Sequence, residues 1–344
     1  MKTRKKIYNK IIENMKNSRK NSTKLYKNIS SLEMNKSYSP IVNKLLDVNE
    51  LKTLKNKSIK LCDNLLQINV GTKSKPICLN FNEKRVKIFL LKNLKSSKHL
   101  DPSKFIAPKQ LYSNCWFNTM FITFFVSDKG RKFFRFFRQL MIQGKLANND
   151  PIKPARLADA FFMFNAAIEA SINSTTLSET NLAKVMNTNN LIAAIYDSLP
   201  KKHIPNLPNI QNIGQAGNPL AYYNDIIKYL YNIPGAKKSI LINKFRHSDF
   251  KTLLLLQSKQ KVFADIIVYS IYDDNVNKKK HEERPGESGT IKDKPTSFTL
   301  NNGKVKYVLD SAIIRDTEAR HFCSLLTCNK IEMGFDGESF SRLS

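Results

Sequence analysis

QLYSNCWFN, residues 110–118, is followed directly by the apolar run TMFITFFV, residues 119–126. The length and composition of this run predict a buried helix that begins near Cys115. A thiol at that position faces the positive end of the helix dipole and the free N–H groups of the first turn, which favour thiolate over thiol. The pattern therefore indicates a nucleophilic cysteine, although a lone cysteine in an apolar segment is more often a small core residue.

Three other residues supply the groups that a thiol nucleophile needs. Gln110, five residues upstream, carries an amide that can donate a hydrogen bond to an oxyanion beside the sulfur. His321 opens the strand-like run HFCSLLTCNKIEMGFDG, residues 321–337, which returns through a turn to Asp336. The alternatives are a buried structural imidazole at His321 and a turn residue at Asp336, since Asp before Gly favours tight turns.

This arrangement resembles the papain-like cysteine peptidases, and within them the ubiquitin-specific proteases. In that family a Cys box with Asn or Gln five or six residues before the nucleophile starts the domain, and a His box closes it. The residues that follow the His-box order here are Tyr307, Leu309, His321, Phe322, Phe335 and Asp336. The sequence departs from the family pattern at Ser113 and Arg320, where glycine is usual.

The resemblance implies Cys115 as nucleophile, His321 as base, Asp336 as orienting acid and Gln110 as oxyanion donor. It also implies substrate contacts at three positions: Asn114, Trp116 and Asn118. For Trp116, packing in the core is the alternative. The implied activity is a thiol hydrolase that cleaves after a C-terminal glycine-type motif and uses neither metal nor cofactor.

The Cys box is followed by SDKGRKFFRFFRQLM, residues 127–141, and together they look like the cysteine proteases carried by large nucleocytoplasmic DNA viruses. This resemblance implies a place in the host cytoplasm or the virion, with a ubiquitin-like conjugate or a viral polyprotein as substrate. A ubiquitin-like tail is basic, so a strongly basic enzyme matches it poorly in charge. The viral polyprotein is therefore a serious rival substrate.

The net charge is extreme, because 57 Lys and Arg residues face only 28 Asp and Glu, which gives +29. Such a field attracts phosphate backbones and acidic proteins. The abundance of Lys, Asn and Ile is also typical of AT-rich coding sequence. A second hypothesis is therefore a virion structural or nucleic-acid-binding protein that retains an inactive peptidase-like fold.

The chain divides into a basic N-terminal extension, residues 1–65, and a peptidase-like domain, residues 66–344. The extension is either a solvated helical arm or a tether to nucleic acid or capsid. Within the domain we expect a helical part, residues 104–200, and a strand-rich part, residues 220–344. The fold class is α+β, with the papain-like layout of a helical lobe followed by an antiparallel β lobe.

Periodicity predicts the elements of the domain in more detail. Ser127 and Asp128 are expected to cap a helix over 129–144 that ends at Gly144 and turns its arginines, Arg131, Arg135 and Arg138, to solvent or to a membrane surface. Further helices are expected at 157–172 and 191–199, a loop at 200–219, and helix or strand at 65–95 and 221–233. Expected strands are 252–257, 262–272, 297–301, 304–314 and 321–328.

The five cysteines are odd in number and show no repeated CxxC pattern. They argue against a disulfide scaffold and a Cys-rich zinc site, and reduced thiols suit the cytosol. His321, Cys323 and Cys328 lack an evident fourth ligand, so we expect no metal there. No apolar run reaches 18 residues, and the N-terminus lacks a signal-peptide core, so we expect no transmembrane segment.

Overall fold

The computed structural model describes residues 67–72, 74–95, 100, 102, 105, 107–108, 110–172, 187–215, 217–231, 242–245, 255, 258–259, 263–269, 271–272, 287–288, 295–316 and 320–338. The N-terminal extension, residues 1–65, therefore lies outside the described residues. Of the expected strand at 252–257, only Leu255 is described. The described residues fall into two compact units, one from positions before 235 and after 310, the other from 235–310.

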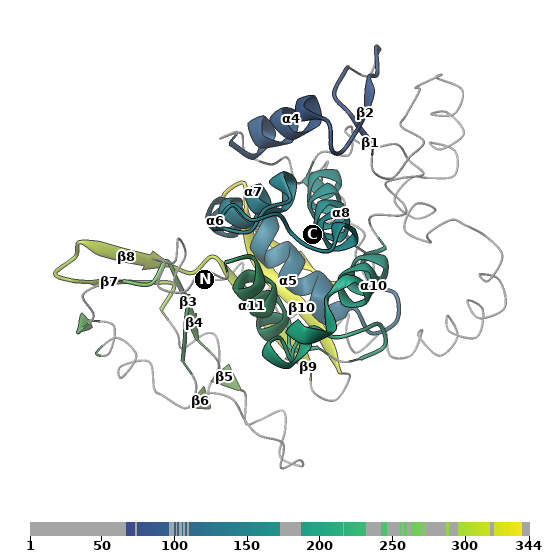
Figure 1. Ribbon diagram of the computed structural model, residues 1–344. Helices are drawn as coiled ribbons and strands as arrows, with labels where there is room; N and C mark the ends of the chain where they lie inside the picture. The colour runs from purple at the N-terminus through teal and green to yellow at the C-terminus, as the bar shows by residue number, and fades with distance from the viewer. Residues whose placement is uncertain are drawn as a thin grey trace. The chain divides into compact units, whose positions relative to one another are not determined.

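The first unit contains most of the helices and the sheet that carries His321 (Figure 1). Its helices are α4 Lys84–Lys95, α5 Cys115–Phe125, α6 Asp128–Phe133, α7 Arg135–Gln143, α8 Ala155–Ile172, α10 Thr188–Ser198, the 3-10 helix η1 Lys201–Asn206 and α11 Pro219–Leu230. Its strands are β1 Gln67–Asn69, β2 Cys78–Asn80, β9 Ser311–Asp316, β10 His321–Cys328 and β11 Ile331–Phe335. The sequence is compatible with either helix or strand at 221–233, and α11 shows that this stretch is helical through Leu230.

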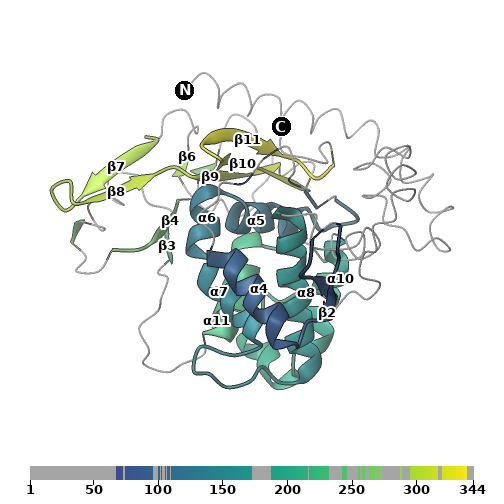
Figure 2. The same cartoon turned by 90° about the horizontal axis from the view of Figure 1, so that it is seen from above.

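Helix α5 is the centre of this unit, and all of its residues are buried. A helix that is apolar on every side needs neighbours all round, and α5 has β10 and β9 on one side with α11 and α6 among its other neighbours. Figure 2 shows the sheet across one face of α5 and the remaining helices on the other. Burying each phenylalanine of α5 contributes roughly 1.5–3 kcal/mol, which fixes the helix that starts with Cys115.

The helix expected at 129–144 is interrupted at Phe134, whose backbone (φ −84°, ψ 5°) ends α6 and begins α7. The Phe134 ring stacks on Phe124 of α5 with centroids 4.0 Å apart, a contact that the helical pattern does not reveal. Both predicted ends are confirmed. The Ser127 hydroxyl accepts the N–H of Gly130, and Gly144 closes α7 in the left-handed conformation.

The prediction that Arg138 faces solvent or a membrane is wrong, because its side chain is buried. Its Nη2 donates to Glu169 at 2.9 Å, and its Nε donates to Asn165 at 2.9 Å. Asn93 on α4 completes this network by donating to Glu169 at 3.0 Å. The buried ion pair therefore joins α7, α8 and α4, and Arg131 and Arg135 remain half-buried.

The strands β9, β10 and β11 form an antiparallel sheet in the order β11-β10-β9. His321 pairs with Asp316 of β9, and Ser324 pairs with Phe335 of β11. Asp128, at the start of α6, accepts the N–H groups of Asn329 and Lys330, at 3.0 and 2.8 Å, in the turn between β10 and β11. The hairpin that carries the predicted base and acid is thus tied to the end of α5.

The described residues of the second unit form three strand pairs. The parallel pairs are β3 Ile242–Phe245 with β4 Ile266–Tyr269, and β5 Ile271–Tyr272 with β6 Glu287–Ser288; the antiparallel pair is β7 Ser297–Leu300 with β8 Val305–Val308. The strand expected at 304–314 is therefore divided, since β8 belongs to this unit and β9 to the other. Tyr307 and Leu309 of the expected His box lie in this second unit.

The chain is an α+β protein, as the sequence predicts. No helix among the described residues is both long enough and apolar enough to cross a bilayer. Cys78 is disulfide-bonded, so the expectation that every thiol is reduced is wrong at this position. Cys115, Cys323 and Cys328 are not part of a disulfide bond, and all three are buried.

Candidate active site

Cys115 is the first residue of α5, so its backbone N–H belongs to the turn whose donors have no partner within the helix. No side-chain hydrogen bond from Asn114 caps the helix at this end, and the positive end of the helix dipole lies at the thiol. Cys115 is buried, with 6% of the residue exposed, and its Sγ donates a long hydrogen bond of 4.0 Å to the carbonyl of Arg320. The helix predicted to begin at this cysteine is therefore confirmed, and its sulfur lies beside the unpaired N–H groups of the first turn.

The predicted base and acid meet at the beginning of the β10–β11 hairpin. His321 is the first residue of β10, and Asp336 follows the last residue of β11. The His321 Nε2 and the Asp336 Oδ1 are 2.9 Å apart, and both side chains are buried. The same carboxylate oxygen accepts the backbone N–H of Glu338 at 3.0 Å. Antiparallel pairing thus joins two groups that lie fifteen residues apart in the sequence.

The pKa of the His321 imidazole depends on this buried, charged environment. Burial lowers the pKa of His321, because desolvation penalises the imidazolium. Attraction to Asp336, to the Cys115 side chain and to the charge of Glu338 acts in the opposite direction. The net result raises the pKa of His321 from 6.5 to about 10, so the ring carries a proton at neutral pH.

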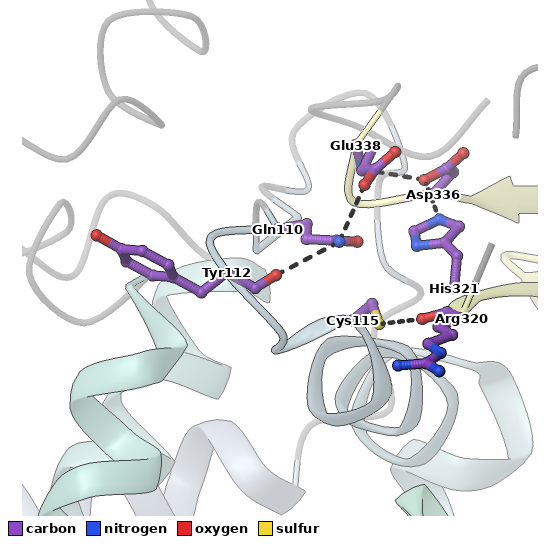
Figure 3. A network of polar contacts seen from close by, with 7 residues as sticks. All are labelled: Gln110, Tyr112, Cys115, Arg320, His321, Asp336 and Glu338. Carbon is purple, nitrogen blue, oxygen red and sulfur yellow. Dashed lines mark hydrogen bonds and ion pairs between the residues drawn. The ribbon is translucent and has the colours of Figure 1, made fainter. Parts of the chain in front are cut away.

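Pairing Nε2 with the acid leaves Nδ1 as the ring nitrogen available to the thiol. Figure 3 shows this second nitrogen on the side of Cys115 and Gln110. The thiol is near enough to raise the pKa of His321, yet within the described part of the chain Nδ1 has no hydrogen-bond partner. Thiol and imidazole are therefore close but not hydrogen-bonded in this conformation, as apo sites often are.

Gln110 also reaches the site, but its amide has an unexpected partner. The Gln110 Nε2 donates to the Glu338 carboxylate at 3.0 Å and more weakly to the Tyr112 carbonyl at 3.5 Å. Its backbone N–H donates to the Gly337 carbonyl at 2.9 Å. Figure 3 shows the amide lying between Cys115 and the turn that carries Asp336 and Glu338.

Three of the buried polar atoms that lack a hydrogen-bond partner among the described residues belong to this site: His321 Nδ1, Asp336 Oδ2 and Gln110 Oε1. Leaving such an atom unsatisfied costs about 1–3 kcal/mol, so each one calls for an explanation. The imidazole, the carboxylate and the amide of this site therefore each retain an atom that can still form a hydrogen bond.

The three residues expected to contact substrate lie in the interior instead. Asn114, Trp116 and Asn118 are 1%, 2% and 0% exposed. The Asn114 amide donates to the Thr188 hydroxyl at 2.8 Å, and that hydroxyl donates to Asn118. These bonds hold the loop before Cys115 against α10, so a substrate could not reach Asn114 or Asn118 in this conformation.

Trp116 packs against Tyr222, with ring centroids 4.9 Å apart, and against the backbone of Gly217. A Cβ atom at Gly217 would approach the indole to 2.5 Å. Trp116 is thus a core residue, as the packing alternative predicts. Its indole fits in this position because residue 217 has no side chain.

Sequence reasoning missed the contributions of Glu338, Arg320 and Thr188. Glu338 and Thr188 could not have been found, because their partners lie 228 and 74 residues away. Arg320 offered a signal. It stands where the resembled family usually has glycine, and its φ of 51° lies in the left-handed region that favours glycine.

Within the described part of the chain, no group of three or more His, Cys, Asp or Glu side chains is arranged to hold a metal ion. The side chains that meet at the site carry a thiol, an imidazole, a carboxylate and an amide. Comparison with protein-family models, with curated proteins and with solved structures finds no match for this chain.

Proposed function

We propose that this chain is a cysteine peptidase of the papain-like type, similar in its site to the ubiquitin-specific proteases. The observation that carries the proposal is the meeting of Cys115 with the His321–Asp336 pair, across about two hundred residues of sequence. The position of Cys115 at a helix start and the orientation of His321 by a buried carboxylate support the same assignment.

In the proposed reaction Cys115 reacts as a thiolate paired with the imidazolium of His321. Its sulfur attacks the carbonyl carbon of the scissile bond and forms an S–C bond. The carbonyl electrons move to oxygen, and this oxyanion is stabilised by the Cys115 backbone N–H and by a Gln110 amide hydrogen. When the intermediate collapses, the C–N bond breaks, and the imidazolium of His321 transfers its proton to the departing amine. An acyl-enzyme remains.

The neutral imidazole then takes a proton from water, whose oxygen attacks the thioester carbonyl. Collapse of the second intermediate breaks the S–C bond and releases the carboxylic acid, and the sulfur and ring return to their starting forms. Asp336 keeps its hydrogen bond to Nε2 throughout, so that Nδ1 faces the reacting atoms in both steps. The protonated resting state of His321 suits a site in which the ring acts first as an acid.

The substrate in this proposal is a ubiquitin-like conjugate or a viral protein, and the place of action is the host cytoplasm or the virion. The basic N-terminal extension would contact nucleic acid or capsid. These parts of the proposal rest on the resemblance of the two boxes and on the charge of +29. The rival proposal, a virion structural or nucleic-acid-binding protein with an inactive site, predicts no dependence of any activity on Cys115.

A covalent probe tests the enzyme proposal. Full-length protein would be incubated with ubiquitin carrying a C-terminal vinyl sulfone, and we expect a stable adduct at Cys115. The adduct should be absent in Cys115→Ala and much slower in His321→Gln. Labelling that persists in Cys115→Ala would contradict the proposal. Reaction with small acyl esters but not with the ubiquitin probe would direct the substrate search to other proteins.

A further inference from the structure

Glu338 lies at the centre of the polar contacts of the site, although it is neither nucleophile nor base. Its carboxylate accepts a hydrogen bond from the Gln110 side-chain amide at 3.0 Å. Its backbone N–H donates to the Asp336 Oδ1, the same atom that holds the His321 ring. One residue therefore contacts both the amide that is expected to bind the oxyanion and the acid that orients the base (Figure 3).

The neighbouring backbone strengthens this connection. The Gln110 N–H donates to the Gly337 carbonyl at 2.9 Å. A Cβ atom at Gly337 would lie 3.1 Å from the Gln110 backbone nitrogen, closer than ordinary van der Waals contact. The turn Asp336–Glu338 and the loop at Gln110 are thus packed as one unit, and the side-chain bond operates within a fixed frame.

A carboxylate is informative at this position, because it can only accept hydrogen bonds. A carboxamide has a donor end and an acceptor end, and rotation by 180° exchanges them. Glu338 selects the orientation in which the Gln110 Nε2 faces it, with one N–H engaged. Among the described residues the second N–H has only the long 3.5 Å contact to the Tyr112 carbonyl, so this hydrogen can bind a substrate instead.

We infer that Glu338 is a positioning residue that fixes the Gln110 amide with its donor end toward the oxyanion. The inference rests on the proposed function, and it deepens that function by adding a residue that the resemblance does not supply. Without the carboxylate, the amide can turn its oxygen toward the developing negative charge and oppose the reaction.

Two probes separate this role from general damage. Acylation of Cys115 by p-nitrophenyl acetate passes through an oxyanion, whereas alkylation by iodoacetamide needs only a reactive sulfur. In the full-length chain we expect Glu338→Gln to slow acylation by ~10-fold or more and to change alkylation by less than about 3-fold. Gln110→Ala should slow acylation by ~10²-fold, as is typical for loss of one oxyanion donor. Asp197→Asn, the same substitution at an exposed carboxylate near the end of α10, should change neither rate.

The double variant gives the decisive comparison. If Glu338 acts through Gln110, Glu338→Gln adds no further loss to Gln110→Ala, and the two effects are strongly non-additive. Independent, additive effects, or equal losses in both reactions, would overturn the inference while leaving the enzyme proposal standing. If wild-type acylation is no faster than that of Cys115→Ala, the proposed function itself fails, and this inference fails with it.

Discussion

The His321–Asp336 pair links the protonation of one residue to the stability of the fold. The pKa of His321 is raised from 6.5 to about 10 on folding, so the folded chain holds this proton more tightly than the unfolded chain. The resulting stabilisation is complete below pH 6.5 and is lost as the pH rises toward 10. The contribution to the free energy of unfolding should fall by at most about 1.4 kcal/mol per pH unit over this window.

Urea unfolding at several pH values, compared between wild type and His321→Gln, isolates this effect. Lysines titrate in the same alkaline range, but they contribute equally to both proteins and cancel in the difference. We expect the difference in the free energy of unfolding to shrink steadily between pH 6.5 and 10. A difference that stays constant over this range would mean that His321 is not protonated in the folded protein at neutral pH.

The backbone conformation of Arg320 positions the carbonyl that accepts the hydrogen bond from the Cys115 thiol. Its φ of 51° is strained for any residue with a side chain, by roughly 1–2 kcal/mol. We expect Arg320→Gly to leave the free energy of unfolding within about 1 kcal/mol of wild type, because relief of strain offsets the entropy of glycine in the unfolded chain. Arg320→Val should lose about 1–3 kcal/mol, since a β-branched residue tolerates this φ poorly. Equal losses in the two variants, measured by urea unfolding, would mean that the arginine side chain matters and the conformation does not.

At the scale of elements, Asp128 holds the β10–β11 turn to the start of α6. The carboxylate accepts the N–H groups of Asn329 and Lys330, which have φ values of 49° and 63°. Asp128→Ala should lower the free energy of unfolding by about 1–3 kcal/mol, because two charge-assisted hydrogen bonds disappear. Since the hairpin carries His321 and Asp336, the rate of Cys115 alkylation should fall as well.

Thermal unfolding would measure the stability of Asp128→Ala. Asp197→Ala is the matched control, because it removes an exposed carboxylate near the end of α10. We expect it to change the free energy of unfolding by less than about 0.5 kcal/mol. Equal stability of Asp128→Ala and Asp197→Ala would show that the turn does not depend on Asp128.

The sequence predicts a helix well when the helix buries all of its faces. It predicts poorly where a helix is interrupted, or which side chain is buried, when a contact with a distant residue determines the outcome. The helix beginning at Cys115 is confirmed because its composition is apolar on every side. The break at Phe134 depends on stacking against Phe124, and the burial of Arg138 depends on Glu169. Neither contact has a periodic signature, so a pattern search sees one continuous helix with a basic face.

The same limit applies to the candidate site. Cys115, His321 and Asp336 could be proposed because their residue types, order and spacing carry chemical meaning. Glu338 could not, since its importance depends on the turn that brings residues 336–338 beside Gln110. The burial of Asn114 and Asn118 likewise depends on Thr188, which no local pattern connects to the loop.

At the scale of the whole molecule, the basic residues 1–65 should be separable from the site. They lie outside the described residues, and no chemical role is assigned to them. Neutralising ~6–10 phosphates would make binding to nucleic acid fall by roughly 10³–10⁵-fold between 50 and 200 mM salt. A chain beginning near Leu65 should lose most of this salt-sensitive binding to a DNA duplex and keep the alkylation rate of Cys115. Unfolding of the shortened chain would mean that the extension is part of the core.

The rate of Cys115 alkylation by iodoacetamide at pH 7 shows whether His321 activates Cys115. Mass spectrometry would follow each cysteine separately in wild type and in His321→Gln, whose folding is checked by circular dichroism. We expect Cys115 to react faster than Cys323 and Cys328 in the wild type. We also expect its alkylation rate to fall by ~10-fold or more in the variant. Equal rates at Cys115 in the two folded proteins would contradict it.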